Sequence, residues 1–329
     1  MVRELVQRGA LQGESGDYMC DADVAELDVP VTVQAAIESR IDRLSASAKR
    51  ALTAASVVGN RFGADLLAAL GVDADFEELL EAELVEQVRF TPVAEYAFRH
   101  PLVRAVAYES QLRSDRAESH RRLAAAIQER APELADENAA QIAEHLYAAG
   151  DLDPAFGWHM RAGARSANRD VAAARVSWER ACRIADESPG DAPPDVLAKR
   201  IAPRTMLCAS GWQAIEETRG RIEELRTLCD EAGDQVSLAI GMTGLATELL
   251  YAGRSVEGSR LMSKQMQLLA SIGDPAVIAL GLIAFNNWFD AGEFDEIVRW
   301  SETIIELTED DPTRGRRYGF RVSARRGAG

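Results

Sequence analysis

The chain has 329 residues, which is long enough to bury a substantial core and to hold two or more domains. Hydrophobic residues make up 47% of it and aromatic residues only 6%, which argues against disorder and favours helices packed by alanine and leucine over an aromatic-rich β-sandwich. The formal net charge of −16 repels nucleic-acid phosphate over most of the surface.

The four cysteines are isolated from one another in the sequence: Cys20, Cys182, Cys208 and Cys229. They form no Cys-x-x-Cys pair, and no histidine stands at metal-ligand spacing from them, which argues against a zinc site. We expect buried, reduced thiols that behave as small hydrophobic residues, although four cysteines could also pair.

No secretion or membrane segment is predicted. The N-terminal stretch MVRELVQRGALQGE carries charges where a signal peptide needs an apolar run. The most apolar later stretches, VSLAIGMTGLATELL and AVIALGLIAFNNWF, are too short to span a bilayer and suit buried helices. A cytoplasmic location without membrane contact is therefore expected.

Residues 1–29 are expected to be the end of a preceding module. The stretch VRELVQRG has the apolar spacing of a short amphipathic helix. Turn residues around Gly13 and Gly16 follow it and predict a short hairpin.

Residues 30–131 are predicted to form a winged-helix-like domain, which begins with helices. One apolar face at helical spacing is made of Val33, Ile37, Ile41 and Leu44. Ser45 can cap a second helix, SAKRALTAASVV, which ends at the turn GNRF. Two shorter helices, ADLLAAL and DFEELLEAELVEQ, come next.

The hydrophobic period then changes from about 3.6 to 2 residues, which predicts a β-hairpin in LVEQVRFTPVAEYAFRH. Val88 and Phe90 share one face of its first strand. Tyr96, Phe98 and His100 share one face of the second, and TPVAE is the turn. Several helices followed by a hairpin is the order of a winged-helix domain.

Helices resume after the hairpin. Pro101 can occupy the first turn of a helix, where its missing N–H costs nothing. Asp115 and Glu118 have the three-residue offset of a capping box for the next helix. On that helix His120 shares a face with Leu123 and Ile127.

Residues 132–312 are predicted to form tetratricopeptide-like (TPR-like) helical repeats. Gly211, Gly253 and Gly292 lie 42 and 39 residues apart, each between the end of one helix and the start of another. A helix pair with this period is typical of an α-solenoid, whose pairs must stack to bury their apolar faces. Residues 313–329 are rich in arginine, have no helical period and are predicted to be a disordered tail.

The sequence contains no recognisable motif for catalysis or cofactor binding. No lysine follows a glycine, so the phosphate-binding loop G-x-x-x-x-G-K-[ST] is absent. G-x-G-x-x-G after a strand, H-E-x-x-H and G-x-S-x-G are absent as well. We therefore assign no catalytic, cofactor-binding or metal-ligating residue, and we expect no cofactor in this chain.

His100 is the best single candidate for acid–base chemistry, with Ser110 as a nearby nucleophile. Ser110 lies ten residues along a helix, however, and nothing supplies an oxyanion hole. We therefore favour the interpretation that His100 caps the helix or packs beside Phe98. The remaining histidines and the tryptophans are interpreted as core or interface residues, with a ligand groove as the lesser alternative: His120, His145, His159, Trp158, Trp178, Trp212, Trp288 and Trp300.

Several stretches resemble a known family: VPVTVQAAIESRIDRLSASAKRALTAASVVGNRF, VRFTPVAEYAFRHPLVRAVAYESQL, HRRLAAAI and ENAAQIAEHLYAAGDLDPAFGWHMRAG. They look like the region after the ATPase core in large actinobacterial regulators that join a STAND-type, AAA-like ATPase to TPR repeats. Some of these regulators carry a class III adenylate cyclase domain and others a LuxR-type helix-turn-helix. The resemblance implies that the nucleotide site lies before Met1, so ATP is implied only for an upstream module.

The leading hypothesis is a non-catalytic regulatory and interaction portion of such a regulator. The repeats would bind a protein, peptide or small-molecule inducer, and the winged-helix-like domain would connect them to the ATPase module. The alternative is a transcriptional regulator that binds DNA through the winged helix. A third possibility is an unrecognised hydrolase that uses His100.

Overall fold

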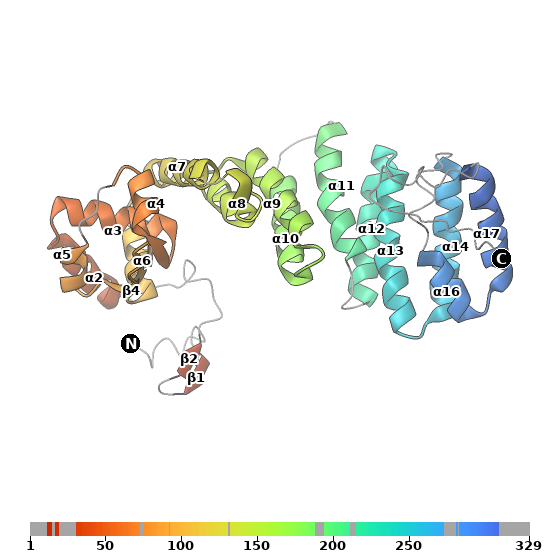
Figure 1. The fold of residues 1–329 in the computed structure, drawn as a ribbon, viewed down its shortest axis with the longest axis horizontal. Coiled ribbons are helices and arrows are strands. Elements are labelled where there is room, and N and C mark those ends of the chain that lie inside the picture. The colour runs from red at the N-terminus through yellow and green to blue at the C-terminus, as the bar shows by residue number, and fades with distance from the viewer. Residues whose placement is uncertain are drawn as a thin grey trace. The chain divides into compact units, whose positions relative to one another are not determined.

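The computed structural model describes residues 12–14, 17–19, 31–72, 76–91, 93–130, 132–187, 194–210, 215–272, 281 and 283–308. They are mostly helical, as the sequence predicts, with a few short strands (Figure 1). The chain divides into two compact units, Met1–Trp158 and His159–Gly329, and each is described by itself. None of the described helices is both long and apolar enough to cross a membrane.

The N-terminal hairpin is confirmed. Strand β1 (Gln12–Glu14) pairs antiparallel with β2 (Asp17–Met19). The predicted helix at VRELVQRG and the predicted tail at 313–329 both lie outside the described residues.

The first helices of the first unit follow the predicted pattern. They are α2 (Val31–Asp42), α3 (Ala46–Val58), α4 (Ala64–Ala69) and α5 (Glu77–Glu81). The predicted apolar face is confirmed for Ile37 and Ile41 of α2 and for Leu44 just after it, which are buried, while Val33 is only partly buried. Ser45 caps α3, as predicted, and its hydroxyl accepts a hydrogen bond from the Ala48 amide at 3.2 Å.

A three-stranded antiparallel sheet completes this domain in the order β3-β5-β4. The predicted hairpin is confirmed as β4 (Val85–Arg89) and β5 (Glu95–Phe98). The expected turn GNRF is wrong in part, because Arg61–Gly63 form strand β3 on the other edge of β5. Three residues are too few to show a period of two, so the sequence pattern could not reveal this strand.

Two further details of the hairpin differ from expectation. The helix expected over DFEELLEAELVEQ ends at Glu81, and Glu83 has a positive φ of 52° at the turn into β4. Phe90, which was expected in the first strand with Val88, lies just beyond the end of β4, and the two side chains are 72% and 39% exposed. The strand register shifts between Gln87 and Arg89, and this irregularity breaks the simple alternation.

The buried face of the sheet holds an aromatic cluster that joins it to the helices. Phe62 of β3 lies 5.4 Å from Phe98 and 6.0 Å from Tyr96, measured between ring centroids. Phe76, which precedes α5, stacks on Tyr96 at 4.1 Å. These contacts fix the sheet on the helices in the winged-helix-like arrangement.

The rest of the first unit is helical: α6 (Pro101–Glu109), α7 (Arg113–Arg130), the short 3₁₀ helix η2 (Pro132–Leu134), α8 (Ala139–Ala148) and the start of α9 (Leu152–Ser166). The predicted capping box is wrong. Helix α7 begins at Arg113, so Asp115 lies inside its first turn, and Glu118 pairs with Arg122 at 3.0 Å. An acidic residue in the first turn still interacts favourably with the helix dipole.

The second unit is a stack of helices with short connections. In chain order they are α10 (Val171–Glu187), α11 (Pro194–Ala209), α12 (Ile215–Ala232), α13 (Gln235–Tyr251), α14 (Ser255–Ile272), α16 (Ile283–Ala291) and α17 (Phe294–Thr308). Helix α13 packs on α11, α12 and α14, and α14 packs on α16 (Figure 1). This is the stacking that the predicted repeats require.

The connections explain the glycine period. Gly233, Gly253 and Gly292 have φ values of 71°, 69° and 75°, a conformation that residues with a side chain rarely adopt. Gly253 and Gly292 belong to the predicted period, whose third member, Gly211, lies outside the described residues. After the first of these turns, Asp234 caps α13 and accepts a hydrogen bond from the Ser237 amide at 3.0 Å. The recurring glycine therefore marks the end of one helix and the reversal into the next.

Candidate functional site

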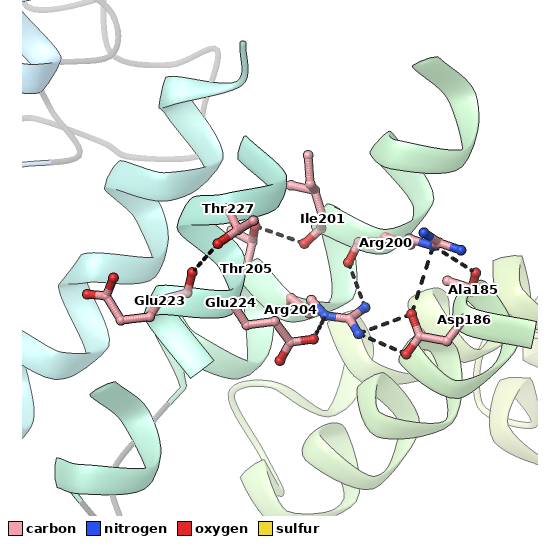
Figure 2. Close-up of polar contacts among 9 residues, drawn as sticks. All are labelled: Ala185, Asp186, Arg200, Ile201, Arg204, Thr205, Glu223, Glu224 and Thr227. Carbon is pink, nitrogen blue, oxygen red and sulfur yellow. Dashed lines mark hydrogen bonds and ion pairs between the residues drawn. The ribbon is translucent and has the colours of Figure 1, made fainter. Parts of the chain in front are cut away.

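A network of charged side chains joins α10, α11 and α12 in the second unit (Figure 2). Its centre is Arg204 on α11, whose Nε donates to Glu224 of α12 at 2.7 Å. Its Nη2 donates to both carboxylate oxygens of Asp186 of α10, at 2.8 and 3.1 Å. One guanidinium therefore bridges three helices through charge-assisted hydrogen bonds.

The backbone completes the coordination of Arg204. Its Nη1 donates to the carbonyl of Arg200, one helical turn earlier, at 3.2 Å. Arg200 itself donates to the carbonyl of Ala185 at 3.4 Å, near the end of α10 (Figure 2). The side chain of Arg204 is only 13% exposed, so these bonds hold it in one orientation.

A second arginine links α10 and α12 beside the first. Arg221 of α12 donates to Glu217, one turn earlier, at 2.9 Å and to Glu179 of α10 at 3.3 Å. A third, Arg175 of α10, donates to the carbonyls of Leu207 and Ser210 at the end of α11, at 3.0 and 3.3 Å. Arginine bonds to the last carbonyls of a helix satisfy groups that have no partner within the helix.

A pocket of about 190 Å³ opens within this network. It is lined by Glu179, Cys182, Arg204, Leu207, Arg221 and Glu224. Pockets for drug-sized ligands are usually about 300 to 1,000 Å³, so this pocket fits only a smaller ligand, of the size of an amino acid or a short dipeptide. Alternating cationic and anionic walls suit a ligand that carries both charges.

Cys182 is not a nucleophile in this pocket. Burial raises the pKa of its thiol to about 11, against the opposing effect of the nearby Arg204 guanidinium. The thiolate is the reactive form of cysteine, and almost none is present near neutral pH. The pocket is therefore equipped for recognition of a ligand rather than for covalent chemistry.

His100 caps a helix, which is one of the two structural roles expected for it. It is the N-cap of α6, and its Nδ1 accepts a hydrogen bond from the Leu102 amide at 3.2 Å, which confirms the capping role. Pro101 occupies the first turn, as predicted. Ser110 lies at the opposite end of α6, where its hydroxyl donates to the Ala107 carbonyl at 2.9 Å. The structure does not bring His100 and Ser110 together.

Two other histidines form a buried cluster that the sequence did not reveal. His120 of α7 and His145 of α8 are both buried, and their Nδ1 atoms lie 3.0 Å apart. The hydroxyl of Tyr108 lies 2.9 Å from Nε2 of His120. The prediction that both histidines belong to the core is confirmed, but their contact depends on a separation of 25 residues that no local pattern encodes.

The remaining predicted core residues are placed as follows. His159, Trp178, Trp288 and Trp300 are buried, as predicted, and Trp158 is partly exposed. Cys208 and Cys229 are buried free thiols, as expected, and Cys182 is a free thiol that is only partly buried, while Cys20 and Trp212 lie outside the described residues. Within the described ranges, no group of three or more histidine, cysteine, aspartate or glutamate residues is arranged to hold a metal ion.

The charged network was not among the sequence-based candidates. Its pairs join residues that are 18, 20 and 42 positions apart, namely Arg204 with Asp186, Arg204 with Glu224, and Arg221 with Glu179. One clue was present in the sequence. Arg200 and Arg204 stand one turn apart in LAKRIAPRTMLC, a helix that otherwise has apolar character.

Comparison with known proteins gives limited similarity. No family model matches the chain. The chain is 30% identical over 142 residues to an uncharacterized protein of Rhizobium meliloti (strain 1021), a match that covers 41% of this chain and 14% of that protein. The chain therefore spans a small part of the length of this relative.

Among solved structures, one similar chain is the Signal Transduction ATPase with Numerous Domains (STAND) protein with a tetratricopeptide repeat sensor from Pyrococcus horikoshii. The superposition has a TM-score of 0.36 and 12% sequence identity, and it covers 87% of this chain and 47% of that chain.

Proposed function

We propose that this chain is the regulatory and interaction portion of a STAND ATPase-type regulator. The helical repeats bind a ligand or partner, and the winged-helix-like domain connects them to an ATPase module. The output of the complete regulator is adenylate cyclase activity or transcription control, as in the family that the sequence resembles. ATP binds to the upstream module rather than to this chain.

The observation that carries the proposal is the charged pocket between α10, α11 and α12. Pockets between the helices of a stack are common sites for small ligands. The side chains that line this one include two arginines and two glutamates, held by bonds from three helices. A ligand that replaced one of these internal ion pairs would change the packing of three helices at once, and this change would signal that the ligand is bound.

The pocket chemistry favours a small zwitterion, such as an amino acid or a short dipeptide. A carboxylate of the ligand would replace Glu224 at Arg204, and an ammonium group would pair with the released glutamate. Both exchanges keep every charge paired, which matters because an unpaired charge in a partly buried site is costly.

The proposal of a non-catalytic chain is tested by assaying the purified protein for ATP hydrolysis and for cyclic-AMP formation. We expect no turnover above a buffer control in either assay. Robust turnover that persists after repeated purification would contradict the proposal. His100→Ala would then show whether that histidine takes part, since loss of its capping bond alone costs about 0.5–2 kcal/mol of stability and no activity.

The ligand class is tested by thermal unfolding with the dipeptide Ala-Ala, its N-acetylated form and its C-terminal amide. A ligand that binds only the folded protein raises the unfolding temperature Tm. We expect stabilisation by the zwitterionic dipeptide alone, and its loss in Arg204→Gln. Arg226→Gln is the matched control, because in the part of the chain that the structure describes Arg226 pairs with Glu223 on the same helix and both side chains are exposed. Equal shifts with the blocked dipeptides, or no shift with any, would exclude a zwitterionic ligand.

The alternative, DNA recognition by the winged helix, has less physical support. The helix before a wing is the usual reading element, and here α5 carries Glu77, Glu78 and Glu81. The wing arginines are also engaged, since Arg89 pairs with Glu95 at 3.3 Å and Arg99 with Glu83 at 3.2 Å.

A further inference from the structure

Helix α17 is apolar on two sides. Its inner side contributes Trp300, which is buried and stacks on Trp288 with ring centroids 6.4 Å apart. Its outer side exposes Phe294, Val298 and Ile305, which are 57%, 57% and 58% exposed. Phe294, Val298, Ser301 and Ile305 are separated by 4, 3 and 4 positions, which is the spacing of residues that pack one helix against another. These four residues are called the stripe of α17.

The repeat shows what such a stripe is for. The pairs Ala252-Gly253 and Ala291-Gly292 align α14 with α17 at an offset of 39 residues. At this offset Ser259, Met262 and Met266 of α14 correspond to Val298, Ser301 and Ile305 of α17. All three residues of α14 are fully buried, although their equivalents on α17 lie on the outer side.

The cover over α14 is a helix. Helix α16 packs on α14, and the Trp288 indole donates to the hydroxyl of Ser263 at 3.1 Å. Ser259 donates to Glu293, which follows α16, at 2.7 Å. In this chain the residues 39 positions after α16 read VSARRGAG, which does not repeat the apolar and aromatic pattern IAFNNWFDA. The stripe of α17 therefore has the pattern of a face that packs against another helix, and the stretch VSARRGAG does not have the pattern of such a helix.

The charges beside the stripe select the kind of helix. Asp295 and Glu302 follow Phe294 and Ser301 along one edge, and both are exposed. Arg299, the single cation on α17, pairs with Glu296 at 3.0 Å and lies 5.3 Å from the centre of the Trp300 ring. In an antiparallel pair of two such helices, Asp295 of one copy would face Glu302 of the other. Like charges at these positions destabilise the pair, which disfavours a second copy of this chain as the occupant.

We propose that the outer face of α17, formed by Phe294, Val298, Ser301 and Ile305 with the acidic edge Asp295 and Glu302, is a docking site for an amphipathic helix of a partner protein. The partner helix presents an apolar stripe to the face and lysine or arginine to the edge. Helix-in-groove recognition of this kind reads side chains at helical spacing. This surface is separate from the pocket of α10–α12, and it shares with the proposed function only the premise that the repeats bind partners.

The test uses a synthetic 18-residue helix of leucine and lysine with all leucines on one side, labelled for fluorescence anisotropy. A scrambled peptide of the same composition keeps the charge and loses the apolar stripe. We expect the amphipathic peptide to bind the full chain at least about tenfold more tightly than the scrambled one, a difference of about 1.4 kcal/mol.

Substitutions then locate the site. Val298→Glu and Ile305→Glu are expected to abolish the preference for the amphipathic peptide, because each places a charge in the apolar stripe. Val176→Glu on α10 is the matched control, since Val176 is equally exposed at 57% and the change adds the same charge. Non-specific attraction of a cationic peptide would be strengthened by all three variants, so only docking on α17 gives opposite outcomes.

The double substitution Asp295→Lys with Glu302→Lys reverses the charge of the acidic edge. It is expected to weaken binding of the amphipathic peptide by roughly tenfold at low salt. Equal binding of the scrambled peptide, or unchanged preference in Val298→Glu, overturns the proposal. Sedimentation that reveals a concentration-dependent dimer, dissolved by Val298→Glu but not by Val176→Glu, assigns the face to a second copy and also overturns it. A negative result for docking on α17 does not affect the dipeptide test of the pocket between α10, α11 and α12, so the two proposals are tested independently.

Discussion

Tyr108, His120 and His145 form a chain of ring and hydroxyl contacts inside the first unit, at 2.9 and 3.0 Å. A neutral histidine has one donor and one acceptor nitrogen, so the two facing Nδ1 atoms must take opposite roles. This row of hydrogen bonds ends at Nε2 of His145, which is buried and has no hydrogen-bond partner in the described structure. These hydrogen bonds can be satisfied only while at least one of the two rings is neutral, because two cationic rings would place protons on both Nδ1 atoms and leave no acceptor between them.

The surroundings of the chain also oppose protonation. Burial lowers the pKa of His120 to about 4, with smaller contributions from His145 and from the cations Arg104 and Arg116. Burial lowers the pKa of His145 to about 4 as well, with Arg104 adding to the effect. Arg116 lies 4.7 Å from the centre of the Tyr108 ring and pairs with Glu109 at 2.9 Å, so the positive charge near the chain is fixed.

Stability is therefore expected to fall as the pH drops from about 6.5 to about 4. A histidine with a depressed pKa binds its proton only in the unfolded state across this window, so the unfolded state gains protons and free energy of unfolding is lost. The full contribution is present above the unfolded pKa of about 6.5 and is lost at acidic pH. Thermal unfolding measured between pH 7.5 and pH 5 checks this, because carboxylates titrate mainly below that range.

The variant His120→Phe isolates the contribution of the chain. It keeps a ring in the core and removes one titrating group, so its Tm should vary less with pH than that of the wild type. His159, whose pKa burial also lowers to about 4, is present in both proteins and cancels in the comparison. Identical pH profiles for the two proteins would show that the histidine chain does not govern acid stability.

At the scale of single residues, the sequence predicted the environment of a side chain better than it predicted which residues that side chain contacts. His100 as a cap and His120 as a core residue followed from the local pattern, because a Pro at the next position and an apolar helix face are visible in the sequence. The contact between His120 and His145, and the bridge from Asp186 through Arg204 to Glu224, depend on which helices pack together. Packing choices of this kind are decided by the whole fold, and a window of a few residues does not contain them.

At the scale of helices and strands, close packing in the second unit depends on a missing side chain. Gly244 of α13 lies against the backbone of Cys208 and Ala209 of α11, and a Cβ at this position would overlap that backbone. The two helices can approach only because residue 244 has no side chain. Gly220 of α12 is also inside a helix, but it is exposed and a Cβ there would meet nothing within 4 Å.

The two glycines are therefore expected to respond to alanine in opposite ways. Gly244→Ala forces α11 and α13 apart and should destabilise the second unit by about 1–3 kcal/mol, the usual range for overpacking. Gly220→Ala should stabilise it by up to about 1 kcal/mol, because alanine has the higher helix propensity and restricts the unfolded chain. Urea unfolding followed by far-UV circular dichroism distinguishes the two. Stabilisation by Gly244→Ala would mean that α11 and α13 do not pack as closely as described.

The same scale shows where the sequence pattern was sufficient. The repeat of helices was predicted because glycine at 253 and 292 marks chain reversals, and the hairpin because Tyr96 and Phe98 alternate with less apolar neighbours. Strand β3 was missed because Arg61–Gly63 is too short to have a period. The first strand of the hairpin was predicted to include Phe90, but β4 ends at Arg89, and the register shift after Gln87 breaks the alternation on which the prediction relied.

At the scale of the whole chain, charge separates regulation from DNA binding. The formal net charge is −16, and all arginines of the stretch 314–329 are included in that total. The winged-helix-like domain has an acidic α5, and its wing arginines Arg89 and Arg99 are paired with glutamates. Phosphate contacts dominate the affinity of proteins for DNA, and a surface of this sign provides few of them.

We therefore expect no sequence-specific DNA binding by the winged-helix-like domain. In gel-shift assays at about 0.15 M salt, chain truncated after residue 312 should not shift a duplex, because its acidic surface repels phosphate. Any shift given by the full chain should disappear with this truncation, which would assign it to the arginine-rich stretch alone. Binding that survives truncation, falls steeply with salt and is lost in Arg89→Ala with Arg99→Ala would instead identify the wing as a DNA reader. That outcome would favour the transcription-factor alternative, since the wing could contact phosphate only after Glu95 and Glu83 had released their arginines.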